Sequence, residues 1–171
     1  MESTKHKLPE NMQIFLTNLK EYIELPLYFY GSIQRYDYFS GSDIDIDIFT
    51  DNEDSTIEKL SHYLDIDKHK FDKTLIQYGK TDIAYGHKIM HKSDKLSLPI
   101  EFCVYNNKYK QVVLRENTSK NELPLYVTAS LIILKYLFYT LKAVNSKTYI
   151  YVKKHLLSTC IGKPVDTFIK W

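Results

Sequence analysis

The segment "DIDIDIF", residues 43–49, alternates charged and apolar residues without interruption, and no other feature constrains the fold as strongly. Successive side chains of a β-strand point to opposite faces of the sheet. One set of residues is therefore predicted to enter a core while the other set shares the opposite face. The apolar set is Ile44, Ile46 and Ile48, and the charged set is Asp43, Asp45 and Asp47.

Carboxylates on one face of a strand repel one another unless a cation compensates them. Asp43 and Asp45 lie roughly 6.5–7 Å apart at Cα along an extended strand, so both carboxylates can reach one or two ions. Oxygen ligands favour Mg²⁺ or Mn²⁺, which complete their coordination with water and phosphate oxygens. The strand therefore predicts a metal site that serves a phosphate substrate.

Two other interpretations of the aspartates need to be weighed. A charged, solvated strand face explains the alternation taken alone. An EF-hand loop is excluded because its sixth position would be Ile48 instead of Gly and its twelfth Asp54 instead of Glu. Asp47 is expected to be a structural acid or a neighbour of the ligands, and not a ligand itself.

A Gly-Ser pair precedes the aspartates. Gly31 has no side chain, so a triphosphate can approach the backbone there. Ser32 can offer a hydroxyl and an N–H to phosphate oxygens. The sequence thus predicts a phosphate cradle beside the metal face.

Gly31-Ser32 followed by Asp43-Ile44-Asp45 resembles the hG[GS]…Dh[DE]h signature of the DNA polymerase β-like nucleotidyltransferase superfamily, in which h is a hydrophobic residue. The spacing between Gly31 and Asp43 is usual in small members, and Arg35 falls where "GSxxRG" places its arginine. The sequence "GSDID", residues 41–45, is also frequent in the family, and it includes Ser42. The resemblance covers residues 30–49 firmly and the surrounding elements loosely. The chain departs from it at Tyr36, where a glycine is usual.

The resemblance implies a chemistry and a ligand set. Asp43 and Asp45 would bind two Mg²⁺ (or Mn²⁺) ions, and Glu101 in "LPIEFCVY" would be the third catalytic and metal-binding acid, although the family more often has Asp there. Asp47 and Asp82 are the alternatives to Glu101. The alternative to a functional role is that Glu101 is only a charged residue on an edge strand. Contacts to the NTP substrate are expected from Gly31, Ser32, Arg35 and Ser42.

The activity implied by the resemblance is transfer of a nucleoside monophosphate from an NTP to an acceptor, with release of pyrophosphate. Glu101 would help to deprotonate the acceptor hydroxyl. The acceptor stays open among nucleic acid, protein and small molecule. The alternative function is a catalytically silent binding module or an antitoxin-like partner protein of the same fold.

The rest of the chain predicts an α+β fold with a mixed sheet and packed helices. An apolar stripe at residues 12–23 and a capping box at Ser55 and Glu58 indicate helices. Strands are expected at 26–31 and 43–49 and at three places between 70 and 107, with a turn at Gly79–Lys80 and with the last two strands paired as a hairpin. Two helices should follow, at 124–143 and at 147–160, the second closed by Gly162.

We expect one nucleotidyltransferase domain over residues 1–171, with a catalytic core at about 10–107 and a helical part at about 120–162. A formal charge of +2 lacks the strong basic excess of many nucleic-acid-binding proteins. The N-terminus lacks the apolar core of a signal peptide, and no Cys-x-x-Cys occurs, which favours a cytoplasmic protein. A homodimer or a partner protein is possible because little of the chain is left for acceptor recognition.

Two segments admit a functional and a structural interpretation. The apolar stretch 123–144 has Lys135 in its middle, which favours a buried core helix over a partner-binding helix or a membrane span. His87 and His91 have the spacing of two zinc ligands on a helix, but their segment is predicted to be a strand and the histidines to be exposed.

Overall fold

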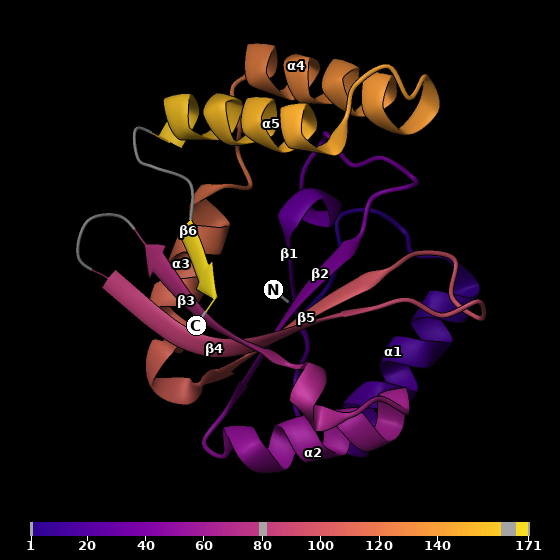
Figure 1. Ribbon diagram of the computed structural model, residues 1–171, viewed down its shortest axis with the longest axis vertical. Coiled ribbons are helices and arrows are strands. Elements are labelled where there is room, and N and C mark those ends of the chain that lie inside the picture. Colours follow the sequence, from indigo (N-terminus) through magenta and orange to yellow (C-terminus); the bar gives the residue numbers. More distant parts are fainter. Residues whose placement is uncertain (1, 79–81, 162–166, 171) are drawn as a thin grey trace.

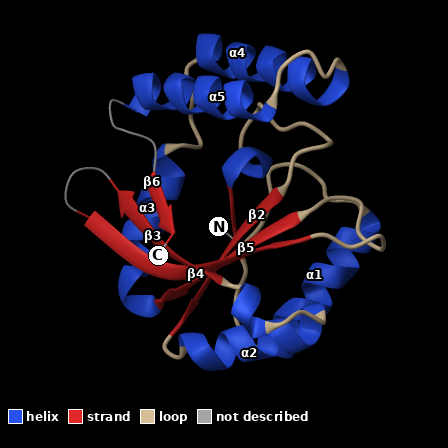
Figure 2. Cartoon of the chain, viewed as in Figure 1, coloured by secondary structure: helices blue, strands red, loops and turns tan. Residues whose placement is uncertain are grey.

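Strand β2 (Ile44–Thr50), which carries the alternating segment, lies inside the sheet in the computed structural model, which describes residues 2–78, 82–161 and 167–170. Over these residues the sheet has six strands in the order β1-β2-β5-β4-β3-β6 (Figures 1 and 2). β2 and β5 are parallel, and every other neighbouring pair is antiparallel. The other strands are β1 (Tyr28–Tyr30), β3 (Asp72–Tyr78), β4 (Asp82–His91), β5 (Ile100–Asn106) and β6 (Thr167–Lys170).

Helices cover both faces of this mixed sheet, so the predicted α+β class is confirmed. The α-helices are α1 (Glu10–Ile23), α2 (Glu53–Leu64), α3 (Lys110–Ser119), α4 (Leu125–Lys135) and α5 (Ser146–Ile161). Shorter helical turns are η1 (Gly31–Gln34), η2 (Lys68–Lys70), η3 (Asn107–Tyr109) and the π-helical η4 (Tyr136–Thr140), which continues α4.

The main core lies between the sheet and the pair α1 and α2. Ile44, Ile46 and Ile48 have no exposed surface and belong to this core, as the alternation predicted. The buried face of α1 repeats at helical spacing, because Met12, Leu16, Leu19 and Ile23 are three and four residues apart. A smaller core with α3 covers part of the opposite face, and it contains Phe49, Cys103, Tyr105 and Val113. The aspartates of β2 therefore face away from α1 and α2.

Several boundaries differ from the sequence prediction. α2 begins at Glu53 because the side chain of Asn52, and not Ser55, caps it by accepting the N–H of Ser55 at 3.1 Å. Helix α3 and strand β6 were not predicted, whereas the β4–β5 hairpin is confirmed. The expected turn at Gly79–Lys80 and the expected stop at Gly162 lie outside the described residues.

Helices α4 and α5 form a hairpin at the top of Figure 1, on the side of the sheet away from α1 and α2. The prediction that α4 is a buried core helix is wrong. Val127 and Leu131 pack toward α5, but Leu125 is 86% exposed and Ile133 is 61% exposed. The apolar stretch therefore covers its neighbour with one face and leaves an uncharged face in solvent. No described helix is both long enough and apolar enough to cross a membrane.

Candidate metal and nucleotide site

Three carboxylates converge on the face of the sheet that points away from α1 and α2. Because β5 runs parallel to β2, Glu101 lies directly beside Asp45 in the sheet. One carboxylate oxygen each of Asp43, Asp45 and Glu101 lies within 4.8 Å of the others. This is close enough for a shared divalent cation, and oxygen donors are those that Mg²⁺ and Mn²⁺ prefer. The strand adjacency on which the choice of Glu101 depends is therefore present.

Gly31 packs directly against one of these carboxylates. Its backbone has φ +73°, the left-handed region that favours glycine, and a Cβ at this position would overlap Oδ2 of Asp45. Ser32 follows in the short helical turn η1, where its side chain is buried. The Gly-Ser pair thus lies against the acidic cluster, and a side chain at position 31 would fill the space beside it.

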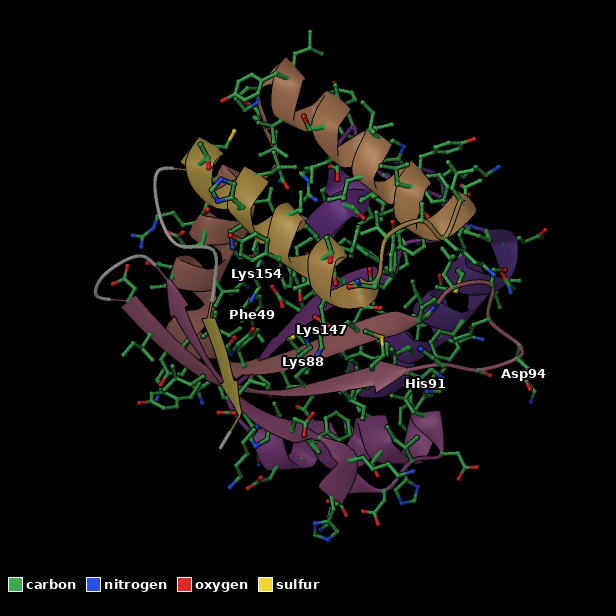
Figure 3. The ribbon with its side chains drawn as sticks, turned by 45° about the horizontal axis from the view of Figure 1, so that its top comes forward. Phe49, Lys88, His91, Asp94, Lys147 and Lys154 are labelled. Carbon is green, nitrogen blue, oxygen red and sulfur yellow. The ribbon has the colours of Figure 1, made fainter. Side chains whose placement is uncertain are left out.

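The carboxylates open into a cavity of about 240 Å³ between the sheet and helix α5. Gly31, Ser32 and Arg35 line it from one side, and Lys153 and Leu157 of α5 line it from the other. Lys88 of β4 and Lys120 lie in the same wall. Figure 3 shows Lys88 on the sheet and Lys154 on α5, which lies across this face. Cationic side chains therefore surround the three acids, an arrangement that suits a phosphate anion together with a divalent cation.

The Asp45 carboxyl is poorly stabilised as an anion in the absence of a cation. Burial and the neighbouring charges of Asp43 and Glu101 raise its pKa well above the usual value, while Lys153 and Arg35 act in the opposite direction. A divalent ion would remove the repulsion between the carboxylates and favour the charged form. The residues present thus fit a hard divalent cation.

Glu101 differs from the two aspartates because donors from the protein hold both of its oxygens. Lys88 Nζ lies 2.6 Å from Oε2, and the Tyr30 hydroxyl donates to Oε1 at 3.3 Å. Burial lowers the pKa of Lys88, but Glu101 outweighs burial and the net shift is upward. Burial, with the nearby Cys103 and Glu101, raises the pKa of Tyr30 well above its usual value, which keeps its hydroxyl a donor.

Asp47 and Asp82, the alternatives to Glu101 as the third acid, contact other residues of the protein. Asp47 is 1% exposed, and Asn117 of α3 donates to its Oδ2 at 2.6 Å. Burial raises the pKa of Asp47 well above the usual value despite that hydrogen bond. Asp82 pairs with Arg115 at 2.6 Å. Neither belongs to the carboxylate cluster, and the expectation that Asp47 is not a ligand stays a prediction.

Arg35 lines the cavity, yet its guanidinium is engaged in a buried ionic cluster. Its Nε and Nη2 donate to the two carboxylate oxygens of Asp37 at 2.7 and 3.2 Å. Lys135 of α4 completes the cluster, with Nζ 2.9 Å from Asp37 Oδ2. This cluster connects η1 to α4, and contact of Arg35 with a triphosphate stays a prediction. Ser42 is buried in the following loop and does not line the cavity, so its role stays a prediction as well.

The two histidines that resembled a zinc pair lie on β4 as predicted, but they are half-buried instead of exposed. His91 stacks on Phe15 of α1 with ring centroids 6.0 Å apart. His87 pairs with Glu53 of α2 at 3.3 Å. Each ring therefore packs against a different helix on the side of the sheet away from the acids.

Five polar residues of the site escaped the sequence analysis: Tyr30, Lys88, Asn117, Lys120 and Lys153. Lys88 and Tyr30 meet Glu101 only through strand pairing, and Lys153 reaches the cavity only because α5 lies across the sheet. The one sequence feature that could have indicated Lys88 is the alternation along β4, which places Lys88 on the opposite face of the strand from His87.

No model of a known protein family matches the chain, and no curated protein matches it significantly. Among solved structures it is similar to Cid1 poly(U) polymerase, with a TM-score of 0.43 and 13% identity over 78% of this chain and 42% of that chain. It is also similar to a cytoplasmic RNA terminal U-transferase, with a TM-score of 0.45 and 15% identity over 83% of this chain and 43% of that chain. The chain thus spans less than half the length of either structure.

Proposed function

We propose that the protein is a metal-dependent nucleotidyltransferase that transfers a nucleoside monophosphate from an NTP to a hydroxyl-bearing acceptor and releases pyrophosphate. One observation carries the proposal: the carboxylates of Asp43, Asp45 and Glu101 converge beside Gly31. Gly31, Asp43 and Asp45 belong to the motif that resembles the polymerase β-like superfamily, and Glu101 is the third acid that the resemblance implies. All four residues line one cavity.

Asp43 and Asp45 would hold Mg²⁺ or Mn²⁺, with the Glu101 carboxylate beside them. Such an ion would neutralise charge on the triphosphate and on the departing pyrophosphate. The absence of a side chain at Gly31 lets the backbone of η1 pack against Asp45, and Gly31 and Ser32 both line the cavity that would hold the phosphates. Lys153 and Lys120 line the cavity and would provide positive charge for the phosphate oxygens. These roles together position the α-phosphorus for in-line attack.

The acceptor has to present its hydroxyl on the Glu101 side of the carboxylate cluster. Glu101 would accept the proton of that hydroxyl while Asp43 and Asp45 keep the metal and the nucleotide in place. Nucleic acid, protein and small molecule all stay candidates for the acceptor, and a second protein chain or a second copy of this chain could help to bind it.

Thermal denaturation with and without Mg²⁺ and each NTP tests the binding part of the proposal. We expect the melting temperature to rise when both are present, since a ligand that binds only the folded state stabilises it. The double variant Asp43→Asn/Asp45→Asn should lose this rise. An equal rise in that variant would place the metal and the nucleotide elsewhere.

Transfer is tested by incubating the protein with labelled NTP, Mg²⁺ or Mn²⁺ and cell extract. The expected product is a labelled RNA, protein or small molecule that the double variant does not form. A nucleotide-induced rise in melting temperature without any labelled product would favour the silent binding module over the enzyme.

A further inference from the structure

The three clustered carboxylates are not equivalent. Both oxygens of Glu101 contact donors from the protein, one from Lys88 and one from Tyr30. Among the described residues, no hydrogen bond or ion pair engages the carboxylate of Asp43 or Asp45. Asp43 and Asp45 are therefore available to bind a cation, whereas Glu101 already pairs with the ammonium group of Lys88.

Strand pairing fixes the position of Lys88. In the antiparallel β4–β5 ladder Lys88 lies opposite Cys103, so Glu101, two residues before Cys103, is its diagonal neighbour on the same face. A long side chain spans this diagonal, and Lys88 Nζ reaches Oε2 of Glu101 at 2.6 Å. The side chains are 25% and 12% exposed, so water screens the pair weakly. The pairing of strands β4 and β5 therefore places the Lys88 ammonium beside Glu101, and this ion pair is not a chance contact at the surface.

We propose that Lys88 takes the place of a second divalent ion, so that the site holds one metal ion on Asp43 and Asp45 while the Lys88 ammonium neutralises Glu101. The inference rests on the proposed function, because it concerns the ions of the same site. Before a nucleotide binds, the formal charge of the groups in direct contact supports it: one divalent ion and the Lys88 ammonium balance the three carboxylates, whereas two divalent ions beside Lys88 would leave an excess of two positive charges among these groups. Such an excess is unfavourable in a partly buried site.

A titration of the protein, residues 1–171, with Mn²⁺, followed by the electron paramagnetic resonance signal of the free ion, counts the bound ions without any turnover. We expect the native protein to bind one Mn²⁺ with high affinity. Lys88→Met removes the ammonium at similar side-chain length, so a second Mn²⁺ should bind about tenfold more tightly or better than it does to the native protein. Lys88→Arg keeps the positive charge and should retain a single ion.

The controls separate this inference from the proposed function. Asp43→Asn/Asp45→Asn should abolish tight Mn²⁺ binding, and retention of it would overturn the metal site itself. Two tight ions in the native protein, or a single ion in Lys88→Met, would overturn only the role of Lys88. Lys88→Gln carries the same expectation and replaces Lys88→Met if that variant does not give the native circular dichroism spectrum.

Discussion

Gly31 and Asp45 are packed so closely that the Cβ of any other residue at position 31 would overlap Oδ2 of Asp45. The sequence suggested that the glycine leaves room for phosphates. The structure adds a second reason, because the backbone of η1 lies directly against a carboxylate of the cluster. The glycine of the motif and its aspartate therefore act as one structural unit.

The first prediction follows from this contact. Gly31→Ala should displace the Asp45 carboxylate and weaken Mn²⁺ binding, and the left-handed backbone should cost a further 1–2 kcal/mol, roughly, in the free energy of unfolding. Metal titration and urea denaturation measure the two effects. Gly41→Ala is the matched control, since a Cβ there would meet its nearest atom, Cδ1 of Tyr139, at an ordinary 3.6 Å. Equal metal affinity in Gly31→Ala and the native protein would contradict the prediction.

The second prediction separates binding from chemistry at Glu101. Glu101→Gln removes the proton acceptor but leaves Asp43 and Asp45 to hold the metal and the nucleotide, so NTP affinity should change little while transfer is almost lost. Nucleotide titration and the labelled-NTP assay give the two quantities. Full transfer by Glu101→Gln would exclude Glu101 as the third acid.

The third prediction compares adjacent lysines of α5. Lys153 lines the cavity, whereas Lys154 is exposed and lies outside its wall. Lys153→Met should weaken NTP binding about tenfold, since a charge-assisted hydrogen bond is lost. Lys154→Met should leave NTP binding unchanged. Nucleotide titration at low and high salt measures both effects, and equal affinities of the two variants would show that Lys153 does not contact the nucleotide.

The fourth prediction concerns the ionic cluster around Asp37. Asp37→Asn leaves the cations of Arg35 and Lys135 buried without a counter-charge, which should lower the free energy of unfolding by about 3–5 kcal/mol. Urea denaturation measures the loss, and Asp94→Asn, at an exposed position in the β4–β5 turn, is the control (Figure 3). A loss no larger than that of the control would mean that the cluster contributes little to stability.

The fifth prediction is the pH dependence of the same cluster. Burial raises the pKa of Asp37, but Arg35 and Lys135 outweigh burial and lower it from 3.8. The folded protein therefore binds fewer protons at this carboxyl than the unfolded chain, so its stabilising effect is complete above about pH 5 and is lost as the pH falls through the lowered pKa. The stability difference between the native protein and Asp37→Asn should shrink below that pH. A difference that stays constant down to pH 3 would contradict the assignment.

The sequence predicted the part of the site that lies within one segment. Alternation along β2 gives both the buried isoleucines and the acids on the opposite face, and the motif spacing brings Gly31 to the same place. Glu101 could be predicted because a charge inside a run of strand formers is unusual. Lys88 could not, since its contact with Glu101 depends on the register between β4 and β5, which sequence alternation does not determine.

Helices α3 and α4 show why some elements escaped prediction or were misinterpreted. The buried face of α3 contains Glu116 and Asn117 besides Val113, so hydrophobic periodicity does not reveal it. α4 is apolar on all sides, which normally indicates a buried helix, yet part of its surface faces solvent. Lys135 is buried beside Asp37, from a distant loop, with which it forms an ion pair that the sequence does not reveal.

The parallel pairing of β2 with β5 also determines when in folding the site can form. Asp45 and Glu101 become neighbours only after the chain has closed a long loop that contains α2, β3 and β4, and closing such a loop slows folding. A divalent ion consequently finds no preformed carboxylate cluster in the unfolded chain. In a refolding experiment, metal uptake should follow the rate of global folding, and added metal should slow unfolding without accelerating folding.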